Sequence, residues 1–216
     1  MQMRVYVPEH PLIKHWLTIA RDSNTPSALF KTAIKELGYL LTYEATRYWF
    51  PTLETTIQTP LAECKATVIN PEIPIAVIPI LRAGLALLEG AQNLLLSPKV
   101  STYHLGLVRD ETTLEASLYL NKLPEKIAPE TRIIIYEPML ATGGTILKAM
   151  TELTSRGAEP AMMRIISVVT APPALQKLSE QYPNLNIYTA IIDEGINSKG
   201  YIVPGLGDAG DRAFGT

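Results

Sequence analysis

The pattern of apolar and polar residues changes period several times along the chain, and each change indicates a different kind of element. Residues 10–22 and 25–46 carry apolar side chains at helical spacing, which predicts two amphipathic helices. Thr25 and Pro26 are placed to serve as the N-cap and the first-turn proline of the second helix. From residue 49 to residue 69 apolar positions alternate with polar ones, which predicts a β-hairpin.

A two-stranded hairpin is only marginally stable by itself, so it must pack on another surface. The neighbouring aromatic residues Tyr48, Trp49 and Phe50 are expected to be exposed, and exposed aromatic side chains favour a contact between subunits. We therefore expect residues 47–70 to form an arm that contacts a second subunit.

The middle of the chain alternates between short hydrophobic strands and amphipathic helices. Strands are predicted at residues 75–81, 100–108, 133–136, 162–169 and 187–192. Helices are predicted at residues 85–90 and 146–153 and after the Pro172-Pro173 pair. This alternation is typical of an α/β fold, an open parallel sheet with right-handed crossovers and helices on both faces. Ligands of such sheets bind beyond the carboxyl ends of the strands, and residues 1–216 suffice for one such domain.

The most informative stretch is the predicted strand, turn and helix between residues 132 and 154. Glu137 lies where the strand ends, and a pair of glycines precedes the helix. Unpaired backbone N–H groups and the helix dipole make such a helix start a good phosphate site. Thr142 and Thr145 can donate to the same phosphate, while Glu137 can accept hydrogen bonds from sugar hydroxyls. The stretch fits a ribose 5-phosphate; the simpler alternative is a capped helix and a solvated strand end.

Two arginines follow other predicted strands at the same edge of the sheet. Arg82 comes after the strand at 75–81, and Arg109 comes after the strand at 100–108. Arginine binds anionic groups bidentately. The less favoured alternative for Arg82 is an ion pair at the rim, and by periodicity alone Arg109 is a solvated loop charge. The polar residues 109–115 are expected to form a mobile loop over the site.

The glycine-rich tail, residues 193–216, contains two partial motifs that lack their usual structural context. Gly205, Gly207 and Gly210 have the spacing of a dinucleotide-binding fingerprint, but too few residues follow for the helix and second strand that it requires. Residues 195–201 begin like a phosphate-binding loop, but Tyr201 stands where Lys is needed. The glycines more simply allow the backbone to approach a flat ligand; a disordered terminus is the alternative.

Composition argues against several functional classes. A net charge of −2 gives no sign of a nucleic-acid-binding surface, and the apolar runs are too short to span a bilayer. The single cysteine, Cys64, excludes an internal disulfide and a cysteine-based zinc cluster, and it favours a reducing, cytoplasmic location. His10 and His15 lack a second ligand at metal-site spacing. These features favour a protein that acts on small molecules.

Three separated strings resemble one enzyme family. Residues 77–85 (VIPILRAGL), 138–145 (PMLATGGT) and 200–211 (GYIVPGLGDAGD) are similar to segments of the uracil phosphoribosyltransferases, a branch of the type I phosphoribosyltransferases. The resemblance implies a glycosyltransferase of pyrimidine salvage that converts uracil and 5-phospho-α-D-ribose 1-diphosphate (PRPP) to UMP and diphosphate. It further implies Mg²⁺ as cofactor, a cytoplasmic homodimer joined through the arm, and GTP as an allosteric effector.

The resemblance also implies roles for individual residues. Arg82, Arg109 and Asp208 would be catalytic, with Asp208 contacting the metal through Mg-PRPP. The implied PRPP-binding residues are Arg82, Arg109, Glu137, Pro138, Met139, Leu140, Ala141, Thr142, Gly143, Gly144, Thr145 and Asp208. The implied uracil-binding residues are Ile202, Gly207, Asp208 and Ala209, within residues 193–216. The family usually has Asp where this chain has Glu137, and the additional methylene moves the carboxylate outward by about 1.5 Å.

Two alternatives stay open at this point. The chain could be a non-catalytic nucleotide or PRPP sensor on the same fold, with Glu137 as the sign of lost activity. It could also be an enzyme that transfers the phosphoribosyl group to another base. Release of diphosphate, measured with uracil, cytosine and purine bases in turn, distinguishes the three hypotheses.

Overall fold

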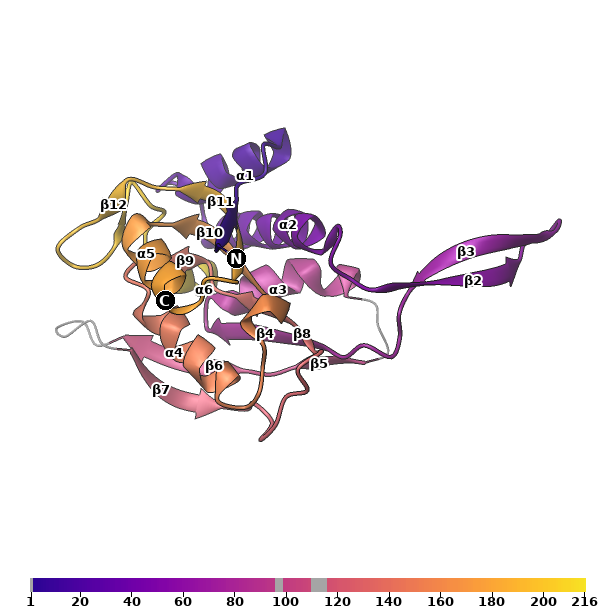
Figure 1. Cartoon of the computed structure of the whole chain (residues 1–216). Helices are drawn as coiled ribbons and strands as arrows, with labels where there is room; N and C mark the ends of the chain where they lie inside the picture. Colours follow the sequence, from indigo (N-terminus) through magenta and orange to yellow (C-terminus); the bar gives the residue numbers. More distant parts are fainter. Residues whose placement is uncertain (1, 96–98, 110–115) are drawn as a thin grey trace.

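The computed structural model describes residues 2–95, 99–109 and 116–216, and the body of the molecule is built on one mixed sheet (Figure 1). In spatial order the main strands are β1 (Arg4–Tyr6), β11 (Asn186–Ile192), β10 (Met163–Thr170), β8 (Arg132–Tyr136), β4 (Ile75–Leu81), β6 (Leu105–Arg109) and β7 (Ala116–Asn121). Two shorter strands extend it, because β5 (Val100–Thr102) pairs with β4 and β9 (Met139–Leu140) pairs with β10. Each of these pairs is parallel except that of β6 with β7.

Helices cover both faces of this sheet. They are α1 (Pro11–Arg21), α2 (Ser27–Thr46), α3 (Gly84–Ala91), α4 (Gly144–Thr154), α5 (Pro172–Gln181) and α6 (Ala209–Phe214), with short 3-10 turns at Gln92–Leu94 and Pro160–Met162. A small antiparallel pair, β12 (Gly195–Ile196) with β13 (Ile202–Val203), lies in the tail. Among the described residues, none of the helices is both long enough and apolar enough to cross a membrane.

Strand β8 shows how the sheet divides the core. Ile134 and Tyr136 belong to the apolar cluster formed with α1, α2 and α3. Ile133 and Ile135 belong to the second cluster, formed with α4 and α5. Because successive strand residues face opposite sides of a sheet, a strand that is apolar throughout needs helices on both faces. The predicted α/β fold is confirmed.

The edges of the sheet differ from the prediction. The predicted strand at 100–108 is two strands, β5 and β6, which pair with successive parts of β4. The chain turns between them at Tyr103, whose N–H donates to the Val77 carbonyl at 3.0 Å. The sequence pattern also misses β1 and the antiparallel β7. Both are edge strands that are held by pairing with a neighbour, so their own side-chain pattern is a weak signal.

Helix α2 begins later than its capping signal predicts. The residue before the helix is Pro26, which supplies no side-chain cap. The Thr25 hydroxyl instead donates to the Ile19 carbonyl at 2.7 Å. The predicted N-cap at Thr25 is therefore wrong, because this hydroxyl ties the turn back to α1.

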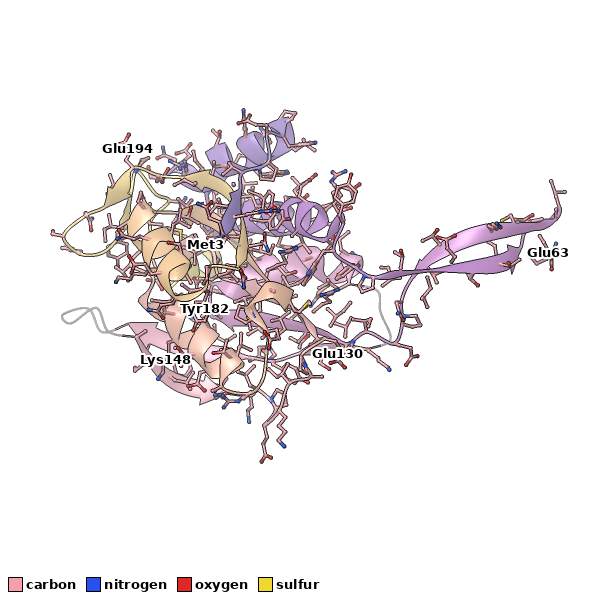
Figure 2. The ribbon with its side chains drawn as sticks, in the orientation of Figure 1. Met3, Glu63, Glu130, Lys148, Tyr182 and Glu194 are labelled. Atoms are coloured by element: carbon pink, nitrogen blue, oxygen red, sulfur yellow. The ribbon has the colours of Figure 1, made fainter. Side chains whose placement is uncertain are left out.

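The predicted hairpin is confirmed as β2 (Thr52–Gln58) and β3 (Glu63–Ile69), an antiparallel pair that extends away from the body (Figure 1). Figure 2 shows Glu63 at its far end. Tyr48, at the base of this arm, is 95% exposed, but Trp49 is only 8% exposed. The expectation that Trp49 is exposed is wrong, because its ring packs against the Arg164 guanidinium, 5.0 Å from the ring centroid.

Candidate functional site

A cleft of about 420 Å³ opens beyond the carboxyl ends of β4 and β8. The end of β4, the turn after β8 and the C-terminal tail form much of its wall. The predicted site residues in this wall are Arg82, Glu137, Met139, Leu140, Ala141, Thr142, Gly143, Thr145, Ile202, Gly207, Asp208 and Ala209. Pro138 and Gly144 lie in the same turn but are not among the lining residues. The two segments that the sequence hypothesis requires to be together therefore share one cleft.

Arg109 is the last residue of β6. Leu107 and Val108, just before it, line the cleft, so the chain leaves the sheet beside the site. The side chain of Arg109 and residues 110–115 lie outside the described part of the chain. The diphosphate contact of Arg109 and the loop over the site both stay predictions.

The turn before α4 is built around Gly143. Its φ of +85° is a left-handed conformation, which glycine adopts without strain. A Cβ at this position would also lie 3.2 Å from the Ala174 Cα. The Thr142 Oγ1 accepts from the Gly144 N–H at 3.5 Å, a long and weak hydrogen bond. Because Gly143 supplies no side-chain cap, the amides of the first turn are suited to binding an anion.

Glu137 is 9% exposed, so it is not the solvated strand end of the simpler alternative. Its backbone N–H donates to the Ile166 carbonyl at 3.0 Å, which continues the edge of β8 beside β10. Burial raises the pKa of its carboxyl to about 8; the Met139 N–H, which donates to the carboxyl, opposes this rise, and the negative charge of Asp208 adds to it. A ligand that donates hydroxyl hydrogens to Glu137 would favour the ionised form.

Arg82 lies across the cleft, at the turn between β4 and α3. Gly84 allows this turn to pack closely against the end of β8, because a Cβ at this position would lie 2.3 Å from the Tyr136 carbonyl oxygen. The guanidinium donates to Asp211 Oδ1 at 2.9 Å and to Thr216 Oγ1 at 3.4 Å. Arg82 therefore forms a rim ion pair and also lines the cleft. Both partners are about half exposed, so the pair is weak and an anionic ligand can compete for the guanidinium.

The tail is held against α1 by two charged side chains, which excludes the disordered alternative. Asp193 is 6% exposed and accepts from Arg21 Nη2 at 2.5 Å and from the Gly205 N–H at 2.8 Å. The Arg212 guanidinium donates to the carbonyls of Ala20, Leu206 and Asp22, at 2.5, 2.7 and 2.6 Å respectively. These bonds join the glycine-rich segment to the end of α1 and fix one wall of the cleft.

The short helix α6 was not predicted. Asp208 caps it by accepting from the Asp211 N–H at 3.0 Å. A cap residue followed three positions later by an acid is a helix-start signal, and in the printed sequence Asp208 and Asp211 carry it.

Comparison with known proteins identifies the family. A family model described as uracil phosphoribosyltransferase matches residues 7–216. The chain belongs to the uracil phosphoribosyltransferase family. It is 68% identical over 216 residues to the uracil phosphoribosyltransferase of Nostoc sp. strain PCC 7120, covering 100% of this chain and 99% of that protein.

Two less similar proteins also match over all or nearly all of the chain. The uracil phosphoribosyltransferase of Arabidopsis thaliana, described as chloroplastic, is 52% identical over 215 residues, covering 100% of this chain and 72% of that protein. The solved structure of the AQ2163 protein from Aquifex aeolicus has a TM-score of 0.87 at 36% identity, covering 97% of each chain. The observed fold is therefore shared with a solved structure of recognisable sequence similarity.

Three cleft residues with polar or charged side chains were missed by sequence reasoning in this uracil phosphoribosyltransferase family member. They are Tyr119 on β7, Tyr201 in the tail and Asp211 on α6. Tyr119 could not have been assigned, because β7 itself was not predicted. Asp211 could have been noted as an acid within the glycine-rich string, and the structure pairs it with Arg82.

Proposed function

We propose that this chain transfers the 5-phosphoribosyl group of PRPP to N1 of uracil, giving UMP and diphosphate. The observation that carries the proposal is the shared cleft: the glycine turn after β8 and the C-terminal tail line the same space. The segment proposed to bind the phosphate and the segment proposed to bind the flat base are therefore adjacent. Membership of the uracil phosphoribosyltransferase family supports the same reaction.

The turn at 137–145 would hold the ribose 5-phosphate. Its first-turn amides and the hydroxyls of Thr142 and Thr145 donate to phosphate oxygens. Glu137, as a carboxylate, accepts hydrogen bonds from the vicinal ribose hydroxyls. Binding energy realised at the 5-phosphate, away from C1′, then fixes the reacting geometry.

The tail would hold uracil. Ile202, Gly207 and Ala209 line the cleft, and the glycine-rich backbone can approach the flat ring closely. A backbone carbonyl facing N3–H and a backbone N–H facing O4 would select uracil, because cytosine reverses donor and acceptor at these positions. Asp208 and Arg82 both approach Gly210, since a Cβ there would lie 3.2 Å from Asp208 Oδ1 and 4.0 Å from Arg82 Nη2.

Chemistry at C1′ needs charge stabilisation but no covalent protein nucleophile. The N1–C1′ bond forms as the bond from C1′ to the diphosphate oxygen breaks, and the N1 proton is released with the products. Arg82, together with the Arg109 predicted from the sequence, would neutralise the leaving diphosphate while the ribosyl centre becomes cationic. To bind the diphosphate, Arg82 must release Asp211. Because this ion pair is about half exposed, the free-energy cost of breaking it is small.

The carboxylates of the cleft fit a magnesium ion that arrives with PRPP. The described residues contain no group of three or more His, Cys, Asp or Glu side chains that could hold a metal by themselves. Mg²⁺ needs only one or two carboxylates when phosphates and water supply the other ligands, and Asp208 is placed in the wall to provide one. When bound, the ion adds positive charge at the diphosphate.

Assembly, effector and location are proposed as follows. The exposed arm would join two copies of the chain as a homodimer, and GTP would act as an allosteric effector, on the family resemblance. We propose neither nucleic acid nor a membrane as a binding partner. Cys64 is an exposed free thiol, which supports a reducing, cytoplasmic location.

A turnover assay tests the proposal. The purified chain is mixed with PRPP and Mg²⁺, and diphosphate release is measured with uracil, cytosine, adenine, hypoxanthine or guanine, with and without GTP. We expect release with uracil and at least 100-fold less with cytosine, because a reversed donor and acceptor leave buried polar groups unpaired. Binding of PRPP without release from any base would identify a sensor instead. Release with a purine base would identify a transferase of different specificity.

A further inference from the structure

A cluster of arginines lies at the amino ends of the parallel strands, on the edge of the sheet opposite the cleft. Arg4 and Arg164 are both in register with Asn186 of β11, so the three residues share one face of the sheet. Arg164 is also in register with Ile134, two positions after Arg132, which places Arg132 on the same face. We refer to Arg4, Arg132 and Arg164 as the amino-edge cluster.

Aromatic rings surround this cluster. The Arg164 guanidinium lies 5.0 Å from the centroid of Trp49 and 6.0 Å from that of Tyr188. The Arg132 guanidinium lies 5.6 Å from the same Trp49 ring. Tyr188 stacks on Tyr6 at a centroid separation of 4.6 Å. Two guanidinium groups therefore lie within cation–π distance of one indole, an arrangement that orders them.

Several donors of the cluster are buried and have no protein partner. They are Arg132 Nε, Arg164 Nε, Arg164 Nη1 and Trp49 Nε1. Buried donors are almost always hydrogen-bonded in native proteins, so a group of four in one place requires a partner from outside the described chain. Arg132 Nη1 is in contact with the sulfur of Met162, which is a poor acceptor.

Negative charge does not balance the cluster within the described residues. None of the ion pairs between described residues includes Arg4, Arg132 or Arg164. Burial lowers the pKa of the Arg164 guanidinium, the tyrosines Tyr188 and Tyr6 oppose this effect, and the charges of Arg132 and Arg4 add to it. Glu44, the acid that faces Tyr188, is already paired with Arg47 at 2.6 Å.

We propose that the amino-edge cluster and Trp49 bind a phosphoryl group, either as inorganic phosphate or as part of a nucleotide, at a second site separate from the cleft. Guanidinium edges match phosphate oxygens bidentately, and the indole N–H adds a further donor. Three cations are balanced better by a dianionic phosphoryl group than by a single carboxylate. The site would couple ligand binding to the base of the arm, because Trp49 lies in the turn just before β2.

Fluorescence of Trp49 tests this proposal. The chain has two tryptophans, so Trp16→Phe leaves Trp49 as the sole reporter, on the edge opposite the cleft. Inorganic phosphate is titrated at constant ionic strength, with chloride as the replaced anion, and ATP is titrated in a second series. We expect a saturable change in emission with phosphate, and tighter binding of ATP if the phosphoryl group is carried by a nucleotide.

Two variants in this background locate the response. Arg164→Met keeps the apolar contact with Trp49 and removes the unpaired donors, so it should abolish the emission change. It should also raise the melting temperature in phosphate-free buffer, because a buried unbalanced charge is removed. Arg156→Met is the matched control: Arg156 is paired with Glu152 at 2.9 Å on α4, and its loss should leave the phosphate response intact.

Three results would overturn the proposal. They are no response in the parent protein, an equal response to chloride, and an unchanged response in Arg164→Met. Loss of self-association in Arg164→Met without any phosphate response would assign the cluster to a subunit contact and would also reject the proposal. If Arg164→Met does not fold, Arg4→Met, which alters an exposed member of the cluster, must weaken phosphate binding at least tenfold.

Discussion

At the scale of single residues, Glu137 combines a structural cost with a functional position. Its carboxyl is buried in the cleft wall beside Asp208, and its pKa is raised from 4.5 to about 8. A shorter Asp at this position would leave more space between the carboxylate and the sugar of the proposed substrate. Burial deprives the Glu137 carboxyl of contacts with water. This cost is offset only if the side chain reaches the ribose of the proposed substrate, where a sugar hydroxyl would donate to the carboxyl in place of water.

This burial predicts a specific dependence of stability on pH. Between pH 4.5 and 8 the unfolded chain carries an ionised Glu137 while the folded chain keeps it protonated. The stabilising contribution of this group is therefore full below pH 4.5 and is lost as pH rises through 8. Glu137→Gln should raise the free energy of unfolding at pH 9 by as much as about 5 kcal/mol relative to the parent protein, without ligand or Mg²⁺.

Denaturant unfolding at pH 5, 7 and 9 measures this effect. The difference between Glu137→Gln and the parent protein should grow with pH. Glu125→Gln, at an exposed position, is the control and should show no comparable trend. A constant difference across this range would show that Glu137 is ionised in the folded state at every pH measured.

At the scale of elements, the tail depends on Arg212. Its guanidinium donates to three carbonyls at the end of α1 and in the tail, and it lies 4.2 Å from the centroid of Phe30. Arg212→Met keeps much of the packing on Phe30 but leaves the carbonyls without this donor. We expect a loss of about 2–4 kcal/mol of stability and a rise of roughly tenfold in the KM for uracil, with a smaller change in the KM for PRPP.

Thermal unfolding and initial-rate kinetics measure the two effects of Arg212→Met. Lys126→Met, at an exposed position outside the cleft lining, is a control for loss of one positive charge. Equal increases in both KM values would indicate general loosening of the cleft, and they would argue against a specific role of the tail in holding uracil.

At the scale of the whole molecule, the arm requires a partner surface. Cross-strand pairing places Leu53 with Val68 and Ile57 with Cys64 on one face of the ribbon. Leu53, Ile57 and Val68 are each more than 40% exposed, so the described part of this chain leaves that face largely uncovered. Polar residues occupy most of the opposite face. An amphipathic ribbon of this kind is suited to a second copy of the chain.

Charges on the apolar face should therefore dissociate the proposed dimer. The double variant Leu53→Lys with Val68→Lys is expected to sediment as a monomer at concentrations where the parent protein is a dimer. Thr52→Lys, on the other face of the ribbon, should remain dimeric. Sedimentation equilibrium measures both, and a double variant that stays dimeric would remove the arm from the interface.

The sequence by itself determined the elements whose signal is local. Apolar runs such as β8 require cover on two faces, and alternation at 49–69 requires a ribbon. The glycine turn could also be recognised, because Gly143 occupies a backbone conformation that other residues rarely adopt. Strand ends in a parallel sheet meet at one edge, so the shared position of Arg82 and Glu137 followed from their places in the sequence.

Only the tertiary structure decided the environment of each side chain. Arg21 and Asp193 are 172 positions apart, and their contact helps to order the tail, although no local pattern announces it. The same holds for the burial of Trp49, the pairing of Arg82 with Asp211, and the convergence of the amino-edge cluster. Burial and charge balance depend on what packs against a residue from distant parts of the chain, and a single sequence does not specify those neighbours directly.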